Sequence, residues 1–166
     1  MKPLLILFVI ALTGCAIAPQ TLPLQRMPFP EAEYATLQKP GTGRAIVRGQ
    51  AFLKTRSGDV KTAAGNQVFL NPVTSYSLEW YEKSYLPNRK MQASDTRLLS
   101  FMPIQVADGS GHFLFKNVPA GEYFISTNVT WEAPTGYQGA LQSQGGVISK
   151  RIRVNSGEEI DVIVTK

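Results

Sequence analysis

The residue types best suited to chemistry gather around His112, the only histidine of the chain. Asp108 and Ser110 precede it closely and Ser126 follows, so the side chains of a Ser-His-Asp hydrolase are all present. No segment has the Gly-x-Ser-x-Gly turn that presents a nucleophilic serine in many hydrolases. We therefore expect His112 to be an ordinary turn residue and the protein not to be an enzyme.

A metal or phosphate site is not expected either. Zinc takes three or four His, Cys or acidic ligands, and the chain has one histidine and one cysteine. The run Asp108 to Gly111 lacks the acidic ligands and the closing glutamate of a calcium loop. Gly145 and Gly146 lack the lysine of a phosphate loop. Turn formation accounts for these residues, and no cofactor is expected.

Cys15, the single cysteine, follows an apolar run from Leu4 to Leu12 that is preceded by Lys2. A membrane-spanning helix needs about 20 apolar residues, so this run is typical of a cleaved secretory signal. The end of the run, Leu12-Thr13-Gly14-Cys15, resembles the lipobox of bacterial lipoproteins. The resemblance implies removal of residues 1–14 and acylation of Cys15. A soluble periplasmic protein with an ordinary cleavage site is the alternative.

The lipobox resemblance also implies a cellular location. Ala16 stands where lipoproteins of the inner membrane typically carry aspartate, so we expect a lipid-anchored protein of the bacterial outer membrane, facing the periplasm. Residues 15–42 contain five prolines and predict a tether between lipid and domain. The alternative is that part of this segment packs along the domain, since Phe29 and Tyr34 would gain from burial.

Residues 43–166 predict one all-β domain. Alternating apolar residues from Ala45 to Leu53 indicate a long half-buried strand. Further strands are predicted at 60–63, 68–73, 98–106, 113–116, 123–131, 148–154 and 159–164. We expect an antiparallel, seven- to eight-stranded sandwich of the transthyretin or immunoglobulin type.

The connections of this sandwich follow from turn residues. Asp108 to Tyr123 is interpreted as the hairpin that closes the sandwich, with Pro119 and Gly121 at its turn. The last two strands are expected to pair with each other across Asn155 to Glu158. Residues 133–146, rich in Gly, Gln and Ser, are predicted to be a loop.

One inserted helix is predicted at about residues 75–93. Ser75 can cap it, and Glu79 precedes Lys83 by four residues. Aromatic pairs four residues apart, Tyr76 with Trp80 and Tyr81 with Tyr85, lie on adjacent helix faces. Pro87 is expected to end or kink the helix.

Residues 43–166 resemble the carboxypeptidase regulatory-like domain. The resemblance lies in Gly43 to Leu53, Gly65 to Leu70, the stretch from Asp108 to Tyr123, and the turn Val154 to Glu158. It implies a transthyretin-like, seven-stranded sandwich that serves as a non-catalytic module. The segment from Ser75 to Asp95 departs from the pattern, because it is longer and more helical.

The charge distribution argues against nucleic acid as a partner. The 17 basic and 12 acidic residues are scattered, and the tightest basic group is Lys150, Arg151 and Arg153. Arg151 and Arg153 share a strand face that Lys150 does not, which is too small a patch for nucleic acid. We expect a solvated sheet face, with contact to anionic lipid or cell-wall polymer as the alternative.

The aromatic residues of the helix are the best interaction candidates. Tyr76, Trp80, Tyr81 and Tyr85 either pack on the core or form a surface for a protein partner, and Tyr137 in the predicted loop is a second candidate. We expect a non-catalytic module that binds or scaffolds another envelope protein. The alternatives are an accessory lipoprotein of a secretion or conjugation machine and a carbohydrate- or peptidoglycan-binding module.

Overall fold

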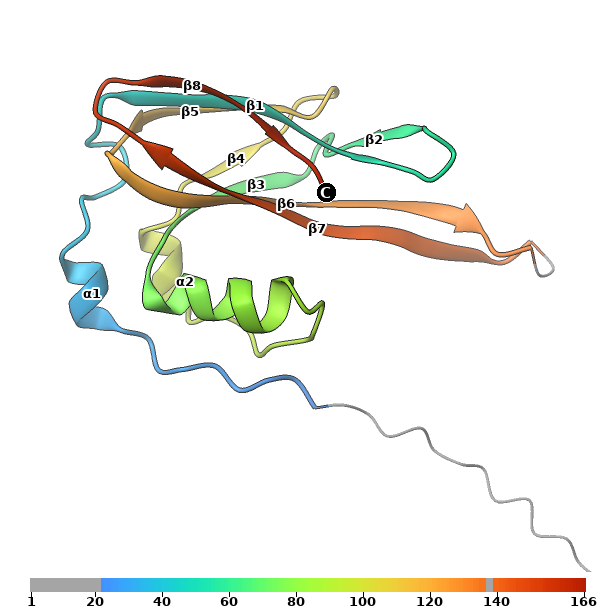
Figure 1. Cartoon of the computed structure of the whole chain (residues 1–166), viewed down its shortest axis with the longest axis horizontal. Coiled ribbons are helices and arrows are strands. Elements are labelled where there is room, and N and C mark those ends of the chain that lie inside the picture. The colour runs from blue at the N-terminus through green and yellow to red at the C-terminus, as the bar shows by residue number, and fades with distance from the viewer. Residues whose placement is uncertain (1–21, 137–138) are drawn as a thin grey trace, which may run out of the picture.

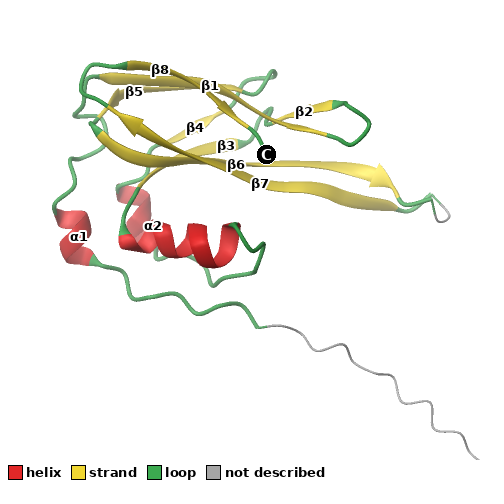
Figure 2. Ribbon diagram, viewed as in Figure 1, coloured by secondary structure: helices red, strands yellow, loops and turns green. Residues whose placement is uncertain are grey.

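The computed structural model describes residues 22–136 and 139–166, and in this part of the chain eight strands form two four-stranded sheets. The sheets pack face to face, and the helices lie on the outer side of one of them (Figure 1). Figure 2 shows that strands dominate the molecule. The predicted all-β sandwich of seven to eight strands with an inserted helix is confirmed.

The first sheet is built around β1, Ala45–Lys54. It pairs antiparallel with two strands and parallel with the last strand of the chain, β8. The other strands of this sheet are β2 (Val60–Thr62), β5 (His112–Val118) and β8 (Glu159–Val164). The sandwich is therefore not purely antiparallel as predicted, because Ile46 to Ala51 run alongside Glu159 to Val164 in the same direction.

The second sheet is antiparallel throughout, in the order β4-β3-β6-β7. Its strands are β3 (Gln67–Pro72), β4 (Ile104–Val106), β6 (Gly121–Pro134) and β7 (Leu141–Val154). The last two form a long hairpin that pairs out to Pro134 and Leu141. The predicted loop at 133–146 is thus mostly strand. Its outer residues cover no core, so no apolar alternation marks them in the sequence.

Two connections differ from the predicted hairpins, because each carries the chain from one sheet to the other. β5 belongs to the first sheet and β6 to the second, so Asp108 to Tyr123 is a corner between sheets. Likewise β7 pairs with β6, whereas β8 pairs with β1, so the last two strands are not partners. Turn residues mark where the chain reverses, but they do not tell which sheet the next strand joins.

The main core lies between the two sheets. Val47 and Phe115 of the first sheet and Leu70, Ile125 and Ile148 of the second are at most 2% exposed. Alternation along each strand directs every second side chain into this core. The intervening residues of the second sheet, such as Phe69, Asn71 and Phe124, therefore face outward, toward the helices.

The inserted helix forms an arm across this outer face. It consists of α2 (Ser75–Trp80) and a π-helical continuation, η1 (Tyr81–Tyr85), and we call residues 75–85 the arm. Thr74, rather than the predicted Ser75, caps it, since the Thr74 hydroxyl accepts a hydrogen bond from Ser77 N at 3.2 Å. The arm ends at Tyr85, two residues before Pro87, and not at Ala93 as predicted.

A second departure follows the arm. Residues Thr96–Ser100 form a 3-10 helix, η2, where a strand from Leu98 was predicted. Asp95 caps it by accepting a hydrogen bond from Arg97 N at 3.0 Å. Only Ile104–Val106 enter the sheet, beyond Pro103.

The segment that precedes the domain packs along the arm, and we call its described part, residues 22–42, the strap. It contains the short helix α1 (Glu31–Ala35). Tyr34 of the strap joins Tyr76 and Leu98 in a second core, where each is at most 5% exposed. From Leu24 onward the strap is therefore part of the folded domain. None of the helices in the described part of the chain is long and apolar enough to cross a membrane.

Candidate functional site

A hollow of about 290 Å³ lies between the strap, the arm and the outer face of the second sheet. We call it the binding hollow. Its walls are Arg26, Phe69, Asn71, Trp80, Ser94, Leu98, Leu99, Met102 and Ser126. Small-molecule sites combine a mostly apolar wall with a few directed polar groups, and this hollow has that composition at the lower end of their size range.

Asn71 supplies an acceptor on the sheet side of the hollow. Val68 and Leu70 point into the core, so the alternation of β3 turns Asn71 outward, beneath the arm. The side chain is 9% exposed, and Asn71 Oδ1 has no hydrogen-bond partner among the described residues. Leaving a buried acceptor unpaired costs about 1–3 kcal/mol. A donor placed in the hollow beside Asn71 Oδ1 would offset this cost.

Arg26 supplies a donor from the strap. Its guanidinium lies 3.7 Å above the centre of the Tyr76 ring, and Nη2 donates to the carbonyl oxygen of Tyr76 at 2.8 Å. Arg26 Nε is buried without a hydrogen-bond partner among the described residues. A carboxylate oxygen of Glu79 lies 3.9 Å from Nε, so the positive charge is compensated although the N–H is not hydrogen-bonded. The hollow thus offers a fixed donor with little net charge.

Trp80 forms an aromatic wall. The ring stacks against Tyr85 at 5.5 Å between centroids and meets Phe124 edge-on at 6.4 Å. These contacts fix the orientation of the indole, and the residue remains partly exposed where it lines the hollow. An aromatic face with negative potential suits the C–H groups of a sugar ring or another weakly polar ring.

The predicted aromatic group is divided by the structure. Tyr76 is 2% exposed, and its hydroxyl accepts a hydrogen bond from Asp95 N at 2.9 Å, so its ring is core and offers no surface to a partner. Tyr81 stacks on Phe124 and on Tyr85. These contacts cover the outer face of the second sheet, which agrees with the alternative that the aromatic residues of the helix pack on the domain. Trp80 alone of the four lines the binding hollow.

Tyr85 ties the end of the arm to the sheet edge. Its hydroxyl accepts a hydrogen bond from Ser149 N at 3.0 Å, on the side of β7 that has no neighbouring strand in the described structure. Cys15 and Tyr137, the other two predicted site residues, lie outside the described residues.

Sequence reasoning missed Arg26 and Asn71. Arg26 stands among prolines in a segment that predicted a tether, and only the fold brings it to the arm. Asn71 precedes Pro72 and looks like the end of a strand. Asparagine is unfavourable within a strand, and this was the signal in the sequence that could have pointed to a role for its side chain.

The residues around His112 form a turn. Asp108 Oδ1 accepts hydrogen bonds from Ser110 N at 2.8 Å and His112 N at 2.9 Å, and these N–H groups lower the pKa of Asp108. His112 and Asp108 are exposed, and Ser126 faces the arm on the other sheet. Among the described residues, no group of three or more His, Cys, Asp or Glu side chains gathers to hold a metal.

Two residues of the basic group near the end of the chain, Arg151 and Arg153, share an ion pair with Glu122. Arg153 donates to a carboxylate oxygen of Glu122 at 2.7 Å, and Arg151 donates to the other oxygen. Both guanidinium groups lower the pKa of Glu122. Exposed pairs of this kind are worth little energetically, so this is a solvated sheet face.

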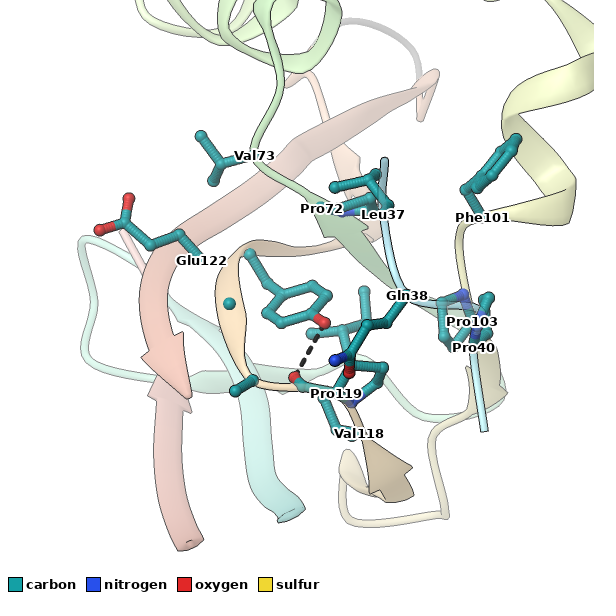
Figure 3. Close-up of a pocket in the computed structure, with 14 residues that line it drawn as sticks. Leu37, Gln38, Pro40, Pro72, Val73, Phe101, Pro103, Val118, Pro119 and Glu122 are labelled. Carbon is teal, nitrogen blue, oxygen red and sulfur yellow. Dashed lines mark hydrogen bonds between the residues drawn. The ribbon is translucent and has the colours of Figure 1, made fainter. Parts of the chain in front are cut away.

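A second hollow, of about 90 Å³, lies where the strap crosses the corner between β5 and β6 (Figure 3). Prolines and apolar side chains line it, and the hydroxyl of Tyr123 donates to the carbonyl oxygen of Pro119 at 2.9 Å. A cavity of about 150 Å³ binds benzene, and this hollow is smaller.

The fold and the binding hollow define a β-sandwich domain with a strap and arm covering one sheet. No family model matches the chain, and no curated protein matches it. The chain is similar to a solved structure, the crystal structure at 2.61 Å of a protein from Pseudomonas aeruginosa that is proposed to bind carbohydrate. The TM-score is 0.71 at 27% identity, over 85% of this chain and 99% of that one.

Proposed function

We propose that this chain is a carbohydrate-binding module that takes one sugar ring in the binding hollow. The observation that carries the proposal is the pair of buried, unpartnered polar atoms, Asn71 Oδ1 and Arg26 Nε, in the same hollow as Trp80. A sugar hydroxyl both donates and accepts, so it can pair with the acceptor of Asn71 or with the donor of Arg26.

The chemistry favours a neutral sugar. Arg26 is compensated by Glu79, so the hollow has no free charge to attract a phosphate or carboxylate. The hydroxyls of Ser94 and Ser126 add polar groups that can act as donor or acceptor. Unpaired polar groups also give selectivity, because an analogue that lacks the matching hydroxyl leaves them unsatisfied.

The similarity to the Pseudomonas protein supports this proposal over the scaffolding function expected from sequence. The arm argues in the same direction, since Tyr76, Tyr81 and Tyr85 are used for packing. Two roles remain predictions: a scaffold for another envelope protein, and an accessory lipoprotein of a secretion or conjugation machine.

The cellular setting is a further part of the proposal. The lipobox-like Leu12 to Cys15 supports a lipid anchor, and Ala16 supports the outer membrane with the domain in the periplasm. There a module of this kind, without catalytic activity, would meet peptidoglycan and other envelope glycans.

The test is a fluorescence titration with Trp80 as the only indole. Trp131 is the other tryptophan, so the Trp131→Phe variant reports on the hollow alone. Titration with neutral monosaccharides and with peptidoglycan fragments should give a saturable change for at least one of them, and Asn71→Leu should raise its midpoint by about tenfold or more. Flat titrations with every sugar would refute the proposal.

A further inference from the structure

The far end of the arm combines exposed apolar and cationic side chains beside the start of the strap. Leu86 is 60% exposed and Leu22 is 87% exposed. Leu22 is the first described residue of the strap, and Leu86 directly follows the arm. Figure 1 shows the first described residues running beneath the arm.

Backbone hydrogen bonds fix these residues near one another. Leu24 N donates to the carbonyl oxygen of Lys90 at 2.9 Å, and Gln92 N donates to the carbonyl oxygen of Leu24 at the same distance. The turn after the arm is closed by a bond of 2.9 Å from Arg89 N to the carbonyl oxygen of Ser84. The beginning of the strap and the turn at 86–90 are therefore one surface.

Three cations lie on the arm or in the turn that follows it. Lys83, Arg89 and Lys90 are exposed, and only Lys83 has an ion-pair partner among the described residues, Glu79 at 3.4 Å. Glu82 is the one exposed carboxylate on the arm itself. This surface therefore has a net positive charge. We call it the arm-end patch, and it consists of Leu22, Lys83, Leu86, Arg89 and Lys90.

We propose that the arm-end patch rests on a bilayer surface that contains anionic lipid. Exposed leucines enter the boundary between headgroups and acyl chains, and lysine and arginine beside them pair with anionic headgroups. A lipid surface favours the exposed leucines and the cations together.

The length of the preceding chain supports this occupant. Leu22 is the seventh residue after Cys15, and a fully extended chain of seven residue steps spans at most about 25 Å. With Cys15 acylated as proposed, the patch is the part of the domain closest to the anchor along the chain. The inference rests on the proposed lipid anchor only for this orientation of the domain. The exposed leucines and cations of the patch do not depend on Cys15.

The test measures vesicle binding without the anchor. A chain that begins at Ala16 lacks Cys15, and it keeps both hydrophobic cores, whose members all lie from Met27 onward. Its sedimentation with vesicles containing phosphatidylglycerol is compared with that on phosphatidylcholine alone. We expect several-fold more binding to the anionic vesicles, with a loss of binding as salt is raised.

Charge-reversal variants test whether the arm-end patch is the part of the domain that contacts the vesicle. Arg89→Glu with Lys90→Glu should weaken binding to anionic vesicles by about 20-fold or more, since each cation near the surface contributes about fivefold. The matched control reverses Lys54 and Arg56, exposed residues at the turn between β1 and β2, with the same change in net charge. This control should retain most of the binding.

Three results would overturn the proposal: equal binding to both vesicle types, equal losses in the two charge-reversed variants, or no binding to any vesicle. In the last case, capture of a protein partner that depends on Leu86 would assign the patch to that partner instead. Sugar binding is measured separately by fluorescence, so failure of this proposal leaves the binding hollow untouched.

Discussion

The hydroxyl groups of Tyr34 and Thr74 lie 2.9 Å apart, in the buried contact between the strap and the start of the arm. Thr74 caps α2, and Tyr34 is 1% exposed. Glu33 strengthens the contact, since its carboxylate accepts a hydrogen bond from Ser75 N at 2.9 Å. Strap and arm therefore form one unit, and the walls of the binding hollow that hold Arg26 and Trp80 depend on it.

Removal of the Tyr34 hydroxyl should loosen this unit. We expect Tyr34→Phe to lower the free energy of unfolding by about 1 kcal/mol, the usual value of one hydrogen bond. Tyr34→Ala should cost about 3–5 kcal/mol, because it also leaves a cavity in the second core. Urea denaturation measures both. Unchanged stability in both variants would show that the strap does not contribute to the fold.

Gly145 should tolerate no side chain. Its φ is +91°, and a Cβ there would lie 2.1 Å from the carbonyl oxygen of Val129 and 2.8 Å from the Trp131 ring. Gly58 is the matched control, since its φ is +98° but a Cβ meets nothing within 4 Å. Gly58→Ala should cost about 1–2 kcal/mol for the backbone alone. Gly145→Ala should cost clearly more in the same thermal melts, and equal losses would contradict the close packing of Trp131.

Asp95 should make stability depend on acidity. Side-chain hydrogen bonds from Arg97, with the Arg97 N–H, lower the pKa of Asp95 from 3.8 to about 2. A lowered pKa stabilises the folded state above about pH 4, and this contribution is lost as the pH falls toward 2. Asp95→Asn should therefore lower the Tm at pH 7 and match the unsubstituted protein near pH 2.

Glu132→Gln is the control for that experiment. Glu132 is an exposed carboxylate of β6 that has no ion pair in the described part of the chain. Its substitution removes one carboxylate charge without breaking an ion pair, so it should lower the Tm at pH 7 less than Asp95→Asn does. A Tm difference for Asp95→Asn that persists at pH 2 would assign its effect to something other than the carboxylate charge.

The strands with one buried face could be predicted from the sequence, and their pairing could not. Ala45 to Leu53 alternates because one face of β1 covers the core, so its position was evident. The parallel pairing of β8 with β1 depends on the turn at Asn155 to Glu158 crossing between sheets. Local turn chemistry is the same for a hairpin and for a crossing of this kind.

The binding hollow was harder to predict, because its residues come from five separate parts of the chain. Trp80 was found through aromatic spacing on a helix. Arg26 lies in a proline-rich segment whose packing depends on distant partners such as Tyr76. Asn71 differs from a surface asparagine only in its burial, and burial is a property of the fold.

Asn71 should be dispensable for folding. Its Oδ1 is buried and unpartnered among the described residues, so Asn71→Leu removes an unfavourable group and should leave stability equal or about 1 kcal/mol higher. Gains of this kind at the expense of activity are typical of binding sites. Asn128→Ala, at an exposed position on the neighbouring strand, is the control. A large destabilisation by Asn71→Leu would assign Asn71 a structural role.

The central claim is that the binding hollow holds a sugar ring against Asn71, Arg26 and Trp80. The most direct measurement is calorimetric titration of the best-binding neutral sugar into the unsubstituted protein, Asn71→Leu and Asn128→Ala. We expect equal affinity for the first and third, and a loss of about tenfold or more for Asn71→Leu, as follows from one lost hydrogen bond of about 1.4 kcal/mol. Equal affinity in all three proteins would contradict the account.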